Sequence, residues 1–130
     1  PGKSILVVED DPDSRMFIQR LLRSEEFQVH ETVNGKEALE YLEAAETPPD
    51  LILLDLMMPI MDGFEFLTRI KKIESLHAIP ILVITAADLS KSDHERLLGS
   101  VENIIQKSGL DKDEILQEIT DLISSKSKGE

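Results

Sequence analysis

Short apolar segments alternate along the chain with longer segments in which apolar residues recur every three or four positions. The short segments are typical of buried strands, and the longer ones are typical of helices that bury one face. The pattern predicts five strands, at Ser4–Val8, Gln28–Thr32, Leu51–Leu54, Ile81–Thr85 and Asn103–Gln106. A helix is expected after each strand, beginning near residues 12, 35, 63, 91 and 111.

Local signals support these helix starts. Pro12 suits a first helical turn, and Asp62 is a natural N-cap. The fourth helix, Lys91–Leu98, is polar except for its last two residues and is expected to be the loosest. The fifth is expected to end near Ser124, with a frayed tail. The first and third helices carry apolar residues at helical spacing, namely Phe17, Ile18, Leu21 and Leu22, and Phe64, Leu67, Ile70 and Ile73.

Strict alternation of strand and helix favours right-handed crossovers, with helices on both faces of a parallel sheet. We therefore predict an α/β fold with a doubly wound, five-stranded parallel sheet of flavodoxin-like order 2-1-3-4-5. The 130 residues suit a single domain, residues 1–130, with an ordered core from about 4 to 124.

Charge and composition limit the classes of partner that the chain could bind. The net charge is −12 and the sequence pI is about 4.6, which makes nucleic acids and anionic membrane surfaces poor partners. The absence of cysteine excludes a disulfide framework and favours a reducing, cytoplasmic setting. No apolar stretch is long enough to span a membrane.

Acidic residues follow two of the predicted strands. Glu9, Asp10 and Asp11 follow the first strand, and Asp55 follows the third, which the predicted order places beside it. Ionised carboxylates that share a pocket repel one another until a proton or a cation relieves the repulsion. Mg²⁺ prefers oxygen ligands, so we predict that Asp10 and Asp55 bind it directly and Glu9 through water. A solvated acidic loop explains one acidic run more easily than two runs at neighbouring strand ends.

Two further residues are expected at the same edge of the sheet. Thr85 ends the fourth strand, before the small residues Ala86 and Ala87, and Lys107 ends the fifth. A hydroxyl and an ammonium opposite a bound cation would surround a phosphoryl group, whose oxygens need to be neutralised and oriented.

The chain resembles the response-regulator receiver domains of two-component signalling. The resemblance rests on four motifs and covers residues from Ile5 to about Ile123: Val7-Val8-Glu9-Asp10, Asp55-Leu56-Met57-Met58-Pro59 with Asp62-Gly63, Thr85-Ala86, and Lys107. It implies that Asp55 is the phosphoacceptor, that Glu9, Asp10, Asp55 and the Met57 carbonyl hold Mg²⁺, and that Thr85 and Lys107 contact the phosphoryl oxygens.

The resemblance also implies the partners. The phosphoryl donor would be a phosphohistidine on a histidine kinase or a histidine phosphotransfer protein. The output would be a downstream protein or a covalently linked domain, and phosphorylation-dependent dimerisation is left open. The chain would catalyse its own phosphorylation and slow dephosphorylation, without being a turnover enzyme. Mn²⁺ is expected to substitute for Mg²⁺.

Met16, near Arg20 and Arg23 on the polar side of the first helix, is a candidate partner contact.

Two positions depart from the family pattern. Ile104 stands where many receivers carry Tyr or Phe, so an aromatic switch is absent. Ser108 stands where many have proline, so we expect a trans peptide bond after Lys107, because a cis bond before a residue other than proline costs roughly 3–4 kcal/mol. His30, His77 and His94 match no metal-binding spacing and are expected at the surface.

Other classes of protein fit the sequence less well. A flavodoxin-type cofactor binder needs hydroxyls and free amides after the first strand, where this chain has Glu9-Asp10-Asp11. A haloacid-dehalogenase-like phosphatase needs a second acid two residues after its nucleophile, where this chain has Met57. A pseudo-receiver that is never phosphorylated would not need all five site residues.

Overall fold

The computed structural model contains a five-stranded parallel sheet of order β2-β1-β3-β4-β5. It describes residues 3–86, 88–107 and 111–128, the side chains of 125–128 excepted. The strands are β1 (Ser4–Val8), β2 (Gln28–Thr32), β3 (Leu51–Leu54), β4 (Ile81–Thr85) and β5 (Asn103–Gln106). The helices are α1 (Pro12–Ser24), α2 (Gly35–Ala44), α3 (Gly63–Ile70), α4 (Lys91–Leu98) and α5 (Lys112–Lys128). The predicted fold class and strand order are confirmed.

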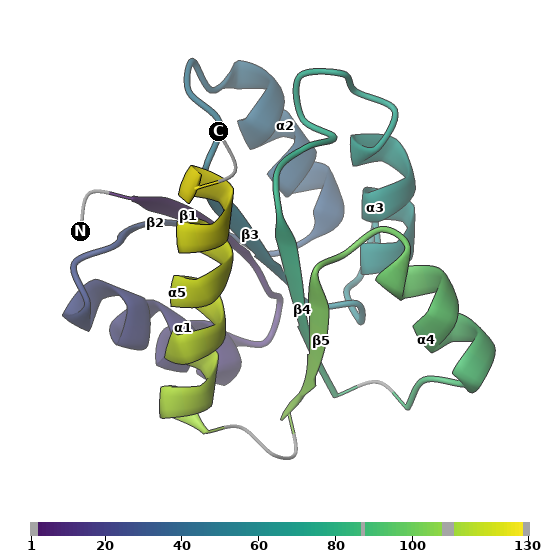
Figure 1. Ribbon diagram of the computed structural model, residues 1–130. Helices are drawn as coiled ribbons and strands as arrows, with labels where there is room; N and C mark the ends of the chain where they lie inside the picture. The colour runs from purple at the N-terminus through teal and green to yellow at the C-terminus, as the bar shows by residue number, and fades with distance from the viewer. Residues whose placement is uncertain (1–2, 87, 108–110, 129–130) are drawn as a thin grey trace.

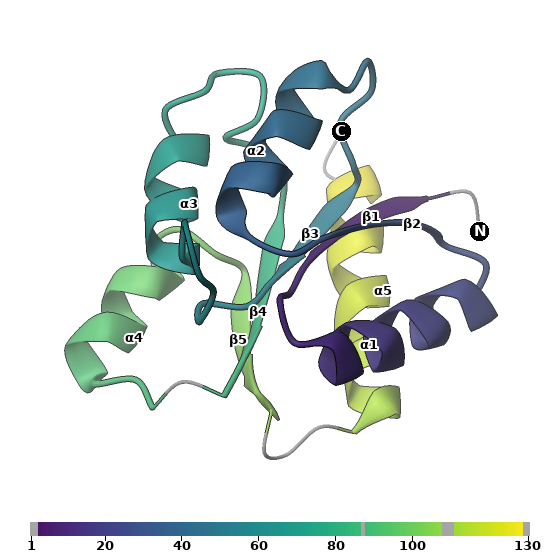
Figure 2. The ribbon, with the colours of Figure 1, turned by 180° about the vertical axis from the view of Figure 1, so that it is seen from behind.

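Two helical layers cover the sheet. Helices α1 and α5 lie on one face, and α2, α3 and α4 lie on the other (Figures 1 and 2). Alternate residues of β1 point to opposite faces, so that Ile5 and Val7 join a core with α1 and α5, while Leu6 and Val8 join a core with α2, α3 and α4. β3 is buried along its whole length, so the strand that precedes Asp55 is held from both sides.

Side-chain capping sets the helix starts. Asp11, Asn34 and Asp62 each accept a hydrogen bond from the backbone N–H three residues later, at the starts of α1, α2 and α3. Asp11 and Asp62 lie in the loops that follow β1 and β3, where the acidic residues gather. The caps therefore determine where the chain leaves the edge of the sheet.

Several helix details differ from the sequence predictions. Phe17 is 41% exposed, because it lies beside the buried stripe of α1 that Ile18 and Leu22 form. Phe66, absent from the predicted face of the third helix, is fully buried. α3 ends at Ile70, before Ile73. α5 continues to Lys128 rather than ending near Ser124, since the sequence has no glycine or proline before Gly129. The predicted trans bond at Lys107-Ser108 lies outside the described residues.

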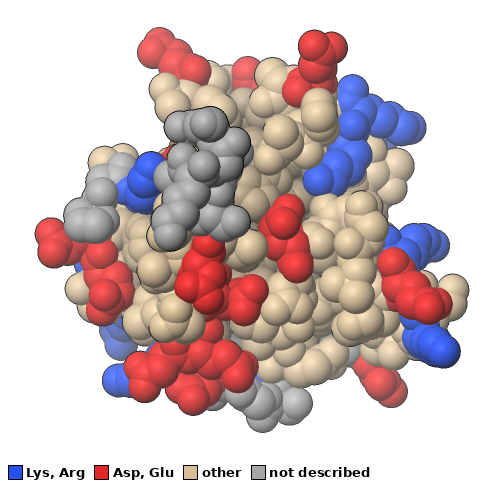
Figure 3. All heavy atoms as spheres, viewed as in Figure 1, with Lys and Arg blue, Asp and Glu red and all other residues tan. Residues whose placement is uncertain are grey.

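The surface is predominantly acidic. In Figure 3, Asp and Glu side chains are scattered over the face shown and cluster near the start of α5, where Asp113 and Glu114 lie in the first turn. No helix in the part of the chain that the structure describes is long and apolar enough to cross a membrane.

Gly63 permits a close approach between the start of α3 and the end of β3. Its N–H donates to the Leu56 carbonyl oxygen at 3.0 Å. A Cβ at this position would lie 2.7 Å from the Leu56 Cα and 2.9 Å from the Asp55 carbonyl oxygen. Both are backbone atoms next to the candidate site, so relief of the contact would move the chain around Asp55.

We predict that Gly63→Ala destabilises the protein by about 1–3 kcal/mol, the usual range for overpacking a tight contact. Gly99→Ala is the matched control, because its Cβ would meet its nearest neighbour, the Arg96 carbonyl oxygen, at 3.5 Å, and its backbone is helical. Urea unfolding of the two variants and the wild type measures the difference. Equal stabilities for the two variants would contradict this account of Gly63.

Candidate functional site

Three carboxylates converge at the carboxyl ends of β1 and β3. The two strands are neighbours, and Val8 is paired with Leu54, so the residues that follow, Glu9 and Asp55, leave the sheet side by side. Glu9, Asp10 and Asp55 each offer an oxygen within 4.8 Å of the others. Glu9 is 2% exposed and Asp55 is 5% exposed, so this acidic cluster is largely removed from water.

Lys107 supplies the positive charge of the cluster. It follows β5, which is separated from β3 by β4, so its side chain reaches across a strand. Its Nζ lies 2.6 Å from Glu9 Oε1 and 3.4 Å from Asp55 Oδ2. One ammonium therefore contacts two of the three carboxylates, and its single charge does not balance theirs.

Burial and the contacts within the cluster shift the pKa of both Glu9 and Lys107. Burial raises the pKa of Glu9 to about 7, the hydrogen bond from Lys107 opposes this shift, and the nearby Asp55 carboxylate adds to it. Burial alone would lower the pKa of Lys107, but its hydrogen bond and charge attraction to Glu9, together with Asp55, raise that pKa above its ordinary value. In the absence of a metal ion, Glu9 therefore takes up a proton at a higher pH than an ordinary glutamate does.

Backbone N–H groups hold the acidic side chains in place. The Asp11 N–H donates to Glu9 Oε2 at 3.1 Å, and the Met57 N–H donates to Asp55 Oδ1 at 3.3 Å. The Asp11 carboxylate accepts a hydrogen bond from the Ser14 N–H at 2.9 Å, and this bond lowers the pKa of Asp11. Asp11 therefore caps α1 and lies outside the group of three candidate metal ligands.

Thr85 and Met57 lie next to the acidic cluster. Thr85 is the last residue of β4 and is fully buried. It follows Val83, the partner of Leu54, by two residues, and so lies at the same edge of the sheet as Asp55. The Met57 side chain is 61% exposed, which is consistent with a role for its backbone only. The Met57 carbonyl as a metal ligand and the phosphoryl contacts of Thr85 and Lys107 stay predictions.

The histidines lie where the sequence predicted. His30, His77 and His94 are exposed, and His30 stacks on Tyr41 with ring centroids 3.8 Å apart. Within the described residues, the only group of three or more acids or histidines with the spacing of a metal site is Glu9, Asp10 and Asp55.

Arg15 was not among the site residues predicted from the sequence. This α1 residue donates from one nitrogen, Nη1, to the carbonyl oxygens of Glu9 and Asp10 at 3.0 and 3.2 Å. The signal that could have indicated it is a basic residue one helical turn after an acidic strand end. Thr32 was not predicted either; it is buried at the end of β2 and donates from Oγ1 to the Val7 carbonyl oxygen at 3.0 Å.

The donor set fits a hard divalent cation. Three carboxylates supply oxygen ligands only, and together they can carry more negative charge than the single Lys107 ammonium balances. Asp10 is half-buried and lines a surface pocket of about 340 Å³ with Leu56, Met57 and Asp62 among its neighbours, so the cluster opens to solvent on this side. Water ligands, which Mg²⁺ retains, can therefore reach it.

Comparison with known proteins gives one consistent result. Residues 5–120 match the family model of the response regulator receiver domain. The chain is 36% identical over 126 residues to the sensor histidine kinase TmoS of Ectopseudomonas mendocina, covering 97% of this chain and 12% of TmoS. It is 35% identical over 106 residues to the polar-differentiation response regulator DivK of Brucella anthropi, covering 81% of this chain and 84% of DivK.

A solved structure agrees in fold along nearly the whole chain. It is the receiver domain of the sensor histidine kinase PA1611 from Pseudomonas aeruginosa PAO1, described as having a magnesium ion coordinated in the active site cleft. The TM-score is 0.83 at 28% identity, covering 95% of this chain and 99% of that one. The chain spans less than two thirds of the length of several curated relatives that it matches.

The raised pKa of Glu9 predicts a pH dependence of metal-free stability. Between its ordinary value of 4.5 and about 7, the folded protein holds a proton on Glu9 that the unfolded chain releases. The stability of the wild type relative to Glu9→Gln should therefore fall as the pH rises through this window, because the folded state binds more protons. Urea unfolding in EDTA at several pH values from about 4.5 to 8 measures the difference. A difference that does not change with pH would contradict the shift.

Proposed function

Because the chain belongs to the response regulator receiver domain family of two-component systems, we propose that Asp55 accepts a phosphoryl group from a phosphohistidine on a partner protein. The observation that carries the proposal is the convergence of Asp55 with Glu9, Asp10 and Lys107 at one edge of the sheet. The family match sets aside the flavodoxin-type and haloacid-dehalogenase-like alternatives.

Receiver domains bind Mg²⁺ at an acidic pocket, and the same role is proposed for this one. The ligands would be carboxylate oxygens of Glu9, Asp10 and Asp55 and the Met57 carbonyl, with Mn²⁺ able to substitute. The magnesium-bound receiver domain of PA1611 supports this assignment by similarity. When bound, the ion supplies positive charge that neutralises the phosphoryl oxygens and orients the group for in-line attack.

The transfer is a displacement at phosphorus by the Asp55 carboxylate. One oxygen of Asp55 forms the new bond to phosphorus while the phosphorus–nitrogen bond of the phosphohistidine breaks, and the imidazole leaves with the electron pair. Lys107, now 3.4 Å from Asp55, would neutralise charge on the phosphoryl oxygens. Water later hydrolyses the acyl phosphate, so the domain is modified and restored rather than acting as a turnover enzyme.

The signal leaves the site through the neighbouring strands. The Thr85 hydroxyl would contact the new phosphoryl group and move toward it. This movement of Thr85 would shift the surface formed by α4, β5 and α5. Ile104 is half-buried on β5 and packs against the core on the α4 side, so the proposal includes no rotating aromatic residue at this position.

Receiver domains interact with histidine kinases and with output domains. For this chain we propose a histidine kinase or a histidine phosphotransfer protein as donor and a downstream protein or linked domain as output, with phosphorylation-dependent dimerisation as a further option. The exchange would take place in the cytoplasm.

Met16, 49% exposed, and its neighbour Phe17 line a surface pocket of about 440 Å³ with Arg20 and Lys112, which supports a partner contact on α1. That residues 1–130 are one domain stays a prediction.

Asp55→Asn tests the phosphoacceptor directly. We expect it to abolish incorporation of base-labile phosphate from acetyl phosphate in Mg²⁺, measured by phosphate-affinity electrophoresis. Asp62→Asn is the matched control, because Asp62 is an exposed carboxylate in the same loop that caps α3, and asparagine also caps helices well. Phosphate incorporation by Asp55→Asn at the rate of the control would reject Asp55 as the acceptor.

A further inference from the structure

The loop that carries Glu9 and Asp10 has a second support besides the sheet. We propose that Arg15 is a positioning residue for the metal site, which fixes the backbone of Glu9 and Asp10 so that their carboxylates meet Asp55. The inference rests on the proposed function, because it concerns how the chain holds Mg²⁺ at the site proposed above.

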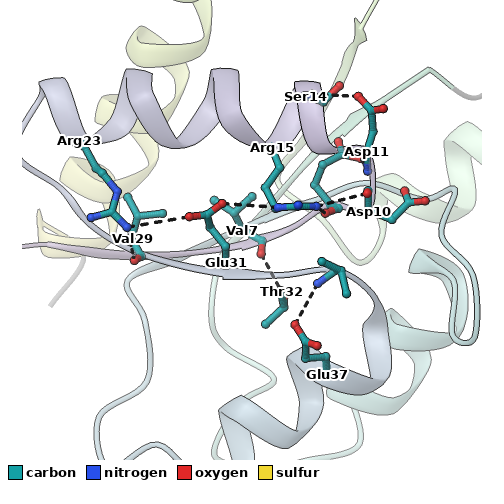
Figure 4. Close-up of polar contacts among 12 residues, drawn as sticks. Val7, Asp10, Asp11, Ser14, Arg15, Arg23, Val29, Glu31, Thr32 and Glu37 are labelled. Carbon is teal, nitrogen blue, oxygen red and sulfur yellow. Dashed lines mark hydrogen bonds and ion pairs between the residues drawn. The ribbon is translucent and has the colours of Figure 1, made fainter.

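The contacts of Arg15 are with the backbone of the loop rather than with its carboxylates. Nη1 donates to the Glu9 carbonyl oxygen at 3.0 Å and to the Asp10 carbonyl oxygen at 3.2 Å. Figure 4 shows the side chain running from the first part of α1 to Asp10, with Glu31 of β2 on its other side. Glu31 Oε1 lies 3.6 Å from Arg15 Nε, and the Arg15 side chain is 23% exposed.

These hydrogen bonds fall where the sheet no longer supports the chain. The pairing of β1 with β2 and β3 ends at Val8. Among the described residues, the backbone of this segment is last tied to the sheet by the hydrogen bond from the Glu9 N–H to the Thr32 carbonyl oxygen, at 3.0 Å. Beyond that point the two successive carbonyls of Glu9 and Asp10 accept from one guanidinium nitrogen, which fixes the orientation of both peptide groups. The directions of the Glu9 and Asp10 side chains follow from those peptide groups.

The loop needs such a support because its own charges oppose the arrangement. Glu9, Asp10 and Asp55 repel one another, and a loop free to move would turn Asp10, the half-buried member, toward solvent. Arg15 holds the loop from the side of α1, away from the carboxylates, and Glu31 holds the guanidinium in place. Outer contacts of this kind typically contribute 10–100-fold to metal affinity.

The proposal can be separated from a simple effect of charge, because the two predict opposite signs. Removal of a positive charge near an acidic site makes the local potential more negative and should strengthen Mg²⁺ binding. Loss of the Arg15 hydrogen bonds that position the loop should weaken Mg²⁺ binding. Arg23 is the matched control on the same helix, since it lies 4.0 Å from Glu31 and donates to the Val29 carbonyl oxygen, in β2 rather than in the acidic loop.

The experiment measures the Mg²⁺ dissociation constant of the unphosphorylated full chain by calorimetric or NMR titration at constant ionic strength. We expect Arg15→Met to weaken binding by about tenfold or more and Arg23→Met to leave it unchanged or slightly tighter. Arg15→Lys should bind more tightly than Arg15→Met, because one nitrogen makes both carbonyl contacts and an ammonium can do the same. Thermal unfolding in EDTA checks that each variant is folded, and Arg15→Gln replaces Arg15→Met if that variant is not.

The outcomes separate this inference from the proposed function. Equal or tighter Mg²⁺ binding by Arg15→Met, beside normal binding by the wild type, would overturn the role of Arg15 and leave the metal site intact. Equal weakening by Arg15→Met and Arg23→Met would also overturn it, because only Arg15 contacts the acidic loop. A wild type without saturable Mg²⁺ binding would reject the metal site itself, and the inference with it.

Discussion

Crowding of Glu9, Asp10 and Asp55 at one edge of the sheet is the constraint around which this structure is organised. Their oxygens come within 4.8 Å of one another, and Glu9 and Asp55 are almost completely buried. Such an arrangement is unfavourable without a compensating charge. Lys107, which follows β5, supplies part of that charge, and its Nζ lies 2.6 Å from Glu9 Oε1. The folded, metal-free protein therefore contains a preformed cation-binding site whose carboxylate repulsion lowers its stability.

The buried sheet holds the acidic residues together in spite of their repulsion. β1 and β3 are buried between two helical layers, so the strands that deliver the acids cannot easily move apart (Figures 1 and 2). Gly63 lets α3 begin directly against the backbone of Leu56 and Asp55, and Asp11 begins α1 immediately after the acidic run. Rigid elements thus surround a short loop, and that loop is the part in which residues such as Arg15 determine the geometry.

The sequence alone predicted the strands from local patterns, and the sheet order and the convergence of the acids from the topology that strict strand and helix alternation favours. Buried strands are short apolar runs, and the carboxyl ends of neighbouring parallel strands meet at one edge. The contacts of Lys107 with Glu9 and Asp55 were not predictable in detail, since its side chain crosses a strand to reach them. Arg15 was missed because its partners are backbone carbonyls, so that its place one helical turn after the acidic run was the only hint of a contact. Phe17 and Phe66 show the same limit for packing, since periodicity alone did not determine which aromatic ring of a helix is buried.

The central claim is that the folded protein carries a carboxylate repulsion that a bound cation relieves. Its most direct test is thermal unfolding of the wild type and Asp55→Asn, each with EDTA and with Mg²⁺ at constant ionic strength, so that general screening is equal. An ion that binds only the folded state stabilises it by about 2.7 kcal/mol at a hundredfold excess over its dissociation constant. We expect Mg²⁺ to raise the melting temperature of the wild type and Asp55→Asn to be the more stable protein in EDTA, with a smaller response to Mg²⁺. An equal shift in both proteins, or no shift in either, would contradict the account.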